Sequence, residues 1–83
     1  MKIWAKVLKD EKIILDTIYE RAGKFDENEF NSYLSEICFG FDIPTPIIIA
    51  VHLDNFLTFN IQKFRPSDFL EAVAFDEFVI ENC

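Results

Sequence analysis

Basic residues are missing from almost half of this 83-residue chain. Residues 25–62 contain no lysine and no arginine, but they carry six acidic residues. The formal charge is +2 over residues 1–24, −6 over residues 25–62 and −3 over residues 63–83, which gives −7 for the chain. A one-sided charge of this kind affects solubility and the choice of partner and says little about the fold.

Glycine is also scarce, and its two positions fit no phosphate-binding pattern. Gly23 and Gly40 are isolated, whereas P-loop and dinucleotide-binding motifs need several glycines between a strand and a helix. A nucleic-acid surface needs clustered cations, and here a net negative field repels phosphate. The sequence therefore predicts no nucleotide cofactor and no nucleic-acid partner.

Histidine and cysteine are too few to form a common metal site or a disulfide scaffold. The chain has one histidine, His52, and two cysteines, Cys38 and Cys83, with no CxxC pair, no HxxxH pair and no calcium-binding loop. Helix capping explains the acidic run at residues 26–29. We expect no metal and no cofactor, and a reducing compartment for the two cysteines.

Long apolar runs are absent as well. The longest uncharged stretch, residues 43–53, contains Pro44 and Pro46 and is too short to cross a bilayer. No apolar segment typical of a signal peptide follows the N-terminal lysines. We therefore expect a cytoplasmic protein without membrane association.

Apolar residues are plentiful: 51% of the chain is hydrophobic, including ten phenylalanines. This much apolar surface is enough to fold, and the length suits one domain spanning residues 1–83. A domain this small has difficulty hiding all of its apolar side chains. The surplus predicts an interface with another molecule.

The N-terminal residues have the pattern of a β-hairpin. Residues 3–8 alternate, so that Trp4 and Leu8 lie on the face opposite Ile3. Residues 13–19 are rich in β-branched and aromatic side chains, which favour a strand. The four polar residues 9–12 between them suit a hairpin loop built on a type I turn.

The most regular helical pattern covers residues 27–40. Asp26 is a good N-cap, and Glu29 three positions later completes a capping-box pair. Apolar side chains then recur at helical spacing and predict one buried face; they are Phe30, Tyr33, Leu34, Ile37, Cys38 and Phe41. Pro44 prevents the helix from continuing.

The second half of the chain is less regular. Residues 47–51 are five apolar residues in a row, which fit either a short strand or the approach to a helix. We expect a short helix over residues 52–59, a turn over residues 64–69 and a final strand over residues 75–81. The prediction is an α+β fold: a small antiparallel sheet, made of the hairpin and the C-terminal strand, with one long and one short helix.

Scattered residues along nearly the whole chain resemble a group of short uncharacterised bacterial cytosolic proteins with no assigned activity. The resemblance rests on single residues and short steps rather than on a chemical motif: Met1-Lys2-Ile3-Trp4, Phe41-Asp42-Ile43, Pro46, Phe56, Phe64, Asp68-Phe69 and Phe75-Asp76. It implies a small cytosolic α+β protein and transfers no site.

The one constellation that suggests catalysis is Cys38 with His52 and Asp54, as a nucleophile with its base and orienting acid. However, Cys38 falls on the apolar face of the predicted helix, where a thiol is a small hydrophobic group and is hard to ionise. We therefore predict that the protein is not an enzyme.

The function that these patterns favour is a non-catalytic cytosolic interaction or regulatory module. Its partner would be another protein or a second copy in a homodimer, with Trp4 and Leu8 as interface residues. Two alternatives remain: an acidic decoy or inhibitor of a basic nucleic-acid-binding protein, and a minor enzyme that uses Cys38 or His52.

Overall fold

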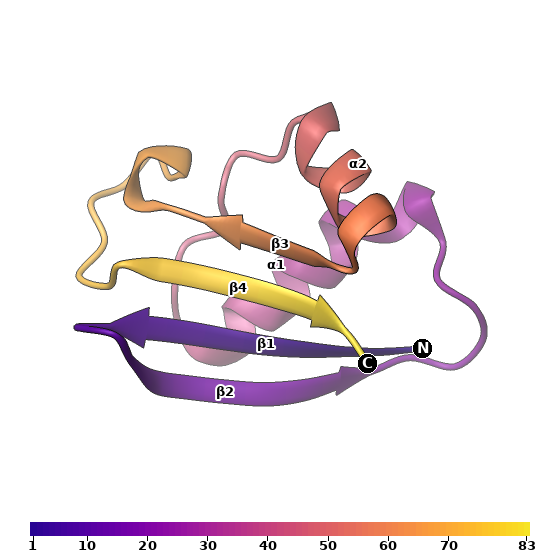
Figure 1. The fold of residues 1–83 in the computed structure, drawn as a ribbon, viewed down its shortest axis with the longest axis horizontal. Coiled ribbons are helices and arrows are strands. Elements are labelled where there is room, and N and C mark those ends of the chain that lie inside the picture. Colours follow the sequence, from indigo (N-terminus) through magenta and orange to yellow (C-terminus); the bar gives the residue numbers. More distant parts are fainter.

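A computed structural model describes all of residues 1–83 (Figure 1). The chain forms four strands, two α-helices and two short 3-10 turns; in order they are β1 (Lys2–Lys9), β2 (Lys12–Glu20), η1 (Glu27–Glu29), α1 (Phe30–Phe41), α2 (Ala50–Phe59), β3 (Ile61–Phe64), η2 (Pro66–Asp68) and β4 (Glu77–Asn82). The strands make one antiparallel sheet in the order β2-β1-β4-β3.

The predicted hairpin is confirmed, but its loop is shorter than predicted. Lys9 pairs with Lys12, so only Asp10 and Glu11 connect β1 to β2. Both have positive φ angles, 52° and 65°, as in the two-residue type I′ turns whose twist matches that of the strands. The Asp10 N–H also donates to the Asp76 carboxylate at 2.8 Å, which ties this turn to the segment before β4.

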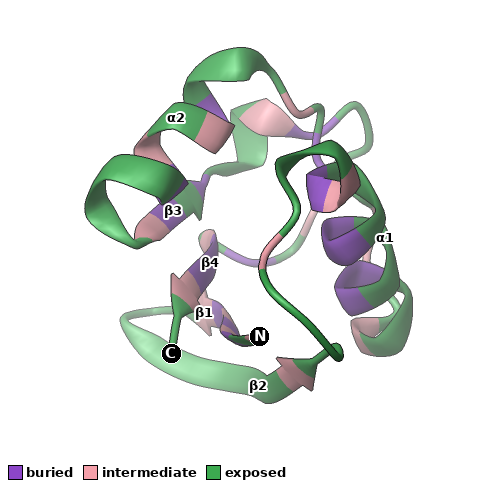
Figure 2. Ribbon diagram, turned by 90° about the vertical axis from the view of Figure 1, so that its right-hand side faces the viewer, coloured by how far each residue is buried: buried purple, intermediate pink, exposed green.

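The sheet has one covered face and one face without a helix. Figure 2 shows the buried residues of α1 on the inner side of the helix, and α2 beside β3. The core fills the space between α1 and the sheet; its 14 members are Ile3, Ala5, Val7, Phe30, Tyr33, Leu34, Ile37, Cys38, Phe56, Phe64, Phe69, Phe75, Phe78 and Ile80. All of the buried β1 residues belong to this face, as the alternation of the strand predicts.

The long helix occupies the predicted segment, although its first turn is a 3-10 turn. Asp26 caps it by accepting from the Asn28 N–H at 2.9 Å. The predicted capping box is wrong: the Asp26 N–H donates to the Tyr33 hydroxyl at 3.1 Å, so the Glu29 carboxylate is not its acceptor. At the other end, Asp42 adopts a left-handed conformation and closes the helix.

The segment before α2 is an approach to that helix, not a strand. Residues 47–49 are irregular and the helix begins at Ala50, two residues earlier than predicted. The His52 side chain caps this start, because its Nδ1 accepts from the Ile49 N–H at 3.1 Å.

One strand that the sequence analysis did not predict, β3, follows α2 directly. The predicted turn over residues 64–69 is wrong at its start, since Phe64 is the last residue of β3 and pairs with Phe78 of β4. Asn60, at φ 60°, makes the sharp reversal from α2 into β3. The overall prediction of an α+β fold with a small antiparallel sheet, one long helix and one short helix is confirmed.

The cap of the long helix gives a direct test of this architecture. We expect Asp26→Ala to lower the free energy of unfolding by about 1 kcal/mol, because it leaves helix N–H groups without an acceptor. Asn31→Ala, at an exposed position of α1, is the matched control and should change the stability little. Urea denaturation of both variants measures the difference, and equal losses would contradict the assigned helix start.

Candidate functional site

Strand β2 is exposed along its length, and it is the feature of the molecule that most clearly lacks a partner. Only Tyr19 among its residues is partly buried (Figure 2). Four large apolar side chains expose 40–52% of their surface; they are Ile13, Ile14, Leu15 and Ile18. They lie on both faces of the strand, with Ile13 and Ile18 on the face without a helix and Leu15 on the helix face. Exposed apolar surface of this kind marks interaction sites in soluble proteins.

One side of the β2 backbone is also unpaired, because β2 is the outermost strand of the sheet (Figure 1). The Arg21 N–H donates to the Met1 carbonyl at 3.1 Å. Since backbone groups alternate in direction along an antiparallel strand, Tyr19 and Thr17 also turn toward β1. Asp16, Ile18 and Glu20 therefore turn their N–H and C=O groups outward. We call this unpaired side of residues 15–20 the β2 edge.

The opposite edge of the sheet is shorter and partly covered. Strand β3 has four residues, and α2 runs beside it, with Asn55 and Phe59 of α2 bordering the same hollow as Ile61 and Lys63 of β3. Short strands and edge lysines are ways in which proteins block unwanted strand pairing. On β2, the comparable features are Lys12 at its start, the charged residues Asp16 and Glu20, and a bulge at Ile14, where the register with β1 shifts.

A groove of about 420 Å³ lies between β2 and α1, on the helix side of the β2 edge. Its walls are Thr17 and Tyr19 from the strand and Ile37, Gly40 and Phe41 from the helix. A Cβ built at Gly40 would meet no atom within 4 Å, so the groove is open there.

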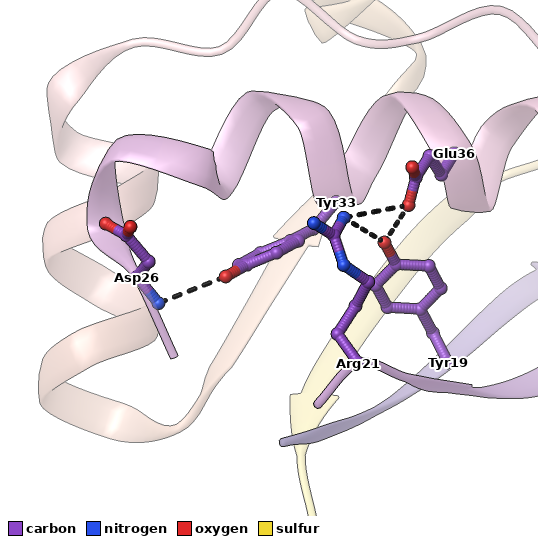
Figure 3. Close-up of polar contacts among 5 residues, drawn as sticks. All are labelled: Tyr19, Arg21, Asp26, Tyr33 and Glu36. Carbon is purple, nitrogen blue, oxygen red and sulfur yellow. Dashed lines mark hydrogen bonds and ion pairs between the residues drawn. The ribbon is translucent and has the colours of Figure 1, made fainter. Parts of the chain in front are cut away.

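Two of the residues that line this groove, Tyr19 and Glu36, form a polar cluster with Arg21 (Figure 3). The Tyr19 hydroxyl donates to the Glu36 carboxylate, and Arg21 approaches both of their oxygen atoms at 3.2 Å. Partial burial and then the Glu36 hydrogen bond raise the pKa of Tyr19 above its usual value of 10.0. The cluster joins β2 to α1 and holds the helix side of the edge in place.

Trp4 and Leu8, the predicted interface residues, lie half-buried on the helix-free face of the sheet. The Trp4 ring is held by its neighbours: its Nε1 donates to Asp16 at 3.1 Å, and the Lys6 ammonium lies 3.8 Å from its centroid. Lys6 is itself paired with Glu81 at 3.2 Å. Trp4 is therefore a fixed element of a polar network that borders the β2 edge.

Cys38 and His52 have separate partners. Cys38 is fully buried, and burial raises the pKa of its thiol to about 12 despite a hydrogen bond with Thr45. His52 packs its ring 4.7 Å from that of Phe64, and its Nε2 lies 3.8 Å from the Asp68 carboxylate. Asp54 is exposed. A thiol this hard to ionise is a poor nucleophile at neutral pH.

The structure contains no group of three or more histidine, cysteine, aspartate or glutamate side chains that could hold a metal ion. None of the helices has the length and apolar character needed to cross a membrane.

Sequence reasoning missed the β2 edge as a site. It placed the interface at Trp4 and Leu8 of the first strand, because the alternation of that strand was clear. The signal for the edge was present in Ile13, Ile14 and Leu15, since three consecutive apolar residues place large side chains on both faces of a strand. A strand in a sheet that is covered on one face needs large apolar side chains on that face only.

Comparisons with known proteins found no matching family model, no matching curated protein and no matching solved structure. The resemblance to short bacterial cytosolic proteins therefore stays a prediction, and the candidate site rests on the geometry of this chain.

The two cysteines provide a test of the assigned core. In the native protein at pH 8, we expect an alkylating reagent to modify exposed Cys83 and to leave buried Cys38 intact. Raising the pH to 9 should still leave Cys38 unmodified, because its thiol pKa is about 12. Mass spectrometry of the digested protein identifies the labelled thiol. Labelling of both cysteines at equal rates without denaturant would contradict this core.

Proposed function

We propose that this protein is a non-catalytic interaction module of the cytoplasm that binds another protein chain along the β2 edge. The observation that carries the proposal is the coincidence, on one strand, of unpaired backbone groups with half-exposed large apolar side chains. Either feature alone is common on protein surfaces. Together they provide both parts of strand addition, in which main-chain hydrogen bonds give affinity and side chains give specificity.

The energetics of the surface favour binding by this route. Covering the exposed half of an isoleucine contributes on the order of 1 kcal/mol, and the β2 edge offers Leu15 and Ile18, with Ile13 and Ile14 beside it. The polar groups that border it are already paired within the molecule, as Trp4 is with Asp16 and Tyr19 with Glu36. A partner therefore meets a preorganised surface and need not rearrange it.

The different partners of Cys38 and His52 support a role without catalysis. Each of these side chains has a local structural partner: Thr45 for Cys38, and Ile49 and Asp68 for His52. In this proposal Cys38 is a core residue and His52 a helix cap. The partner is a protein, with neither nucleic acid nor membrane involved, which agrees with the net charge of −7.

The placement of the acidic side chains favours solubility over the decoy function. Asp26 and Glu27 lie before α1, Asp42 lies at its far end, and Asp54 lies on α2. They come from different elements of the fold, whereas a mimic of a phosphate backbone needs charges at regular spacing along one face.

A capture experiment with two matched variants tests the proposal. The protein is immobilised and exposed to native cytosol, and the captured proteins are quantified by mass spectrometry. We expect Ile18→Asp to remove specific partners, because it places a charge in the middle of the β2 edge. Leu70→Asp, at a position that is 88% exposed and outside the sheet, should retain them.

The same capture by all three proteins would contradict binding at the β2 edge. Capture at low salt of basic nucleic-acid-binding proteins, lost at high salt and unaffected by Ile18→Asp, would favour the decoy function instead, since screening weakens exposed charge pairs.

A further inference from the structure

We propose that the chain seated on the β2 edge is the β2 edge of a second copy, so that two sheets join into one antiparallel sheet of eight strands. This inference rests on the proposed function, because it names the partner of the same surface. The two copies are related by a two-fold axis that passes through Thr17, perpendicular to the sheet. Such an axis gives an interface in which each copy uses the same residues.

The directions of the backbone groups allow this pairing. Asp16 and Ile18 turn their N–H and C=O groups outward, and Thr17 between them turns toward β1, as the Arg21–Met1 hydrogen bond requires. With the axis at Thr17, Asp16 of one copy lies opposite Ile18 of the other. Each of these two pairs exchanges two hydrogen bonds, so four bonds form around the axis.

Three neighbouring registers each meet an obstacle. An axis at Asp16 brings two carboxylates directly opposite each other, and an axis at Ile18 brings Asp16 opposite Glu20; like charges opposite one another destabilise strand pairs. An axis at Leu15 places the bulge at Ile14 inside the paired region of both copies, where it interrupts the ladder. The register centred on Thr17 avoids both obstacles.

The side chains that meet in this register suit one another. On the helix-free face, Ile18 of one copy covers the stem of Asp16 of the other copy. The carboxylate of that Asp16 keeps its hydrogen bond to Trp4 of its own chain. On the other face, Leu15 of the second copy lies opposite Tyr19, at the mouth of the groove between β2 and α1. Two threonines face each other on the axis, a favourable pair in antiparallel sheets.

The distribution of charge selects a second copy at this surface. Each copy carries −7, so two copies repel unless they meet where the charge is balanced. Residues 2–20, which form the hairpin, carry no net charge, because four lysines balance four acidic residues, while residues 25–62 and 63–83 carry −6 and −3. Contact through the hairpins therefore joins the least acidic surfaces, whereas a basic partner would be attracted to the remainder of the molecule.

The net repulsion also predicts an unusual salt dependence. Salt screens the repulsion between two negative molecules over roughly 10 Å at 0.1 M, while the backbone hydrogen bonds and apolar contacts of the edge remain. We expect self-association to strengthen as salt is raised. A complex held by attraction to a basic protein would weaken.

The first test measures mass against concentration by light scattering and analytical ultracentrifugation at 0.1 M salt. We expect the mean mass to rise toward twice 9.7 kDa between about 10 μM and 1 mM, the range of a small interface. Ile18→Asp, which faces Asp16 of the second copy, should raise the dissociation constant at least tenfold. Ile18→Lys also removes the apolar side chain, but it places a positive charge opposite the Asp16 carboxylate of the second copy. It should therefore associate more tightly than Ile18→Asp.

A monomer at all concentrations would overturn the dimer, as would equal association of the aspartate and lysine variants. A different result would contradict the proposed function: capture of the same proteins by Ile18→Asp and by Leu70→Asp. The two failures are therefore distinguishable.

The second test does not depend on variants that weaken the dimer. In a Cys83→Ser background, Thr17→Cys places two thiols at the axis, in a non-hydrogen-bonded pair with Cα atoms about 4.5 Å apart, a separation that a disulfide accepts. Lys63→Cys, an exposed position on the β3 edge, is the control. We expect mild oxidation to give a covalent dimer for Thr17→Cys alone. Equal cross-linking of the two variants, or none for Thr17→Cys, would overturn the axis at Thr17.

Discussion

The unpaired backbone of β2 is the constraint on which this account depends. A nine-residue strand whose outward N–H and C=O groups meet no other strand must leave them to water or to a second chain. The rest of the fold explains why β2 is the strand left in this position. Strand β1 is paired on both sides, β4 is paired on both sides, and β3 is short and flanked by α2.

The composition of the chain fits this arrangement. One face of the sheet packs against α1 and α2 and absorbs most of the phenylalanines. Part of the apolar surplus falls on β2, and the rest is exposed on the two helices and the loops around them. Four of the eight cations lie in the hairpin and balance its four acidic residues, while residues 25–62 contain no cation. The part of the molecule with the least net charge is therefore also the part with unpaired backbone, and strand pairing between copies meets the least repulsion there.

Local patterns in the sequence predicted the elements that depend on neighbouring residues. The hairpin followed from alternation, and the long helix followed from the Asp26 cap and its apolar spacing. The hairpin loop was mispredicted because Asp10 and Glu11 adopt positive φ angles, for which aspartate and glutamate give a weaker signal than asparagine or glycine. Strand β3 was missed because four residues are too few for a period and because its pairing with β4 is made at a distance along the chain. The site was missed for a related reason: which strand becomes an edge depends on the order β2-β1-β4-β3, and no local pattern encodes that order.

Amide hydrogen exchange along β2, followed by NMR at about 10 μM and about 1 mM protein, tests the pairing of the β2 edge most directly. The amides of Thr17 and Tyr19 point toward β1 and should exchange slowly at both concentrations. The amides of Asp16 and Ile18 point outward; they should exchange quickly in the dilute sample and become protected in the concentrated one, because a second copy then accepts their hydrogen bonds. Outward amides that exchange at the same rate at both concentrations would contradict the account.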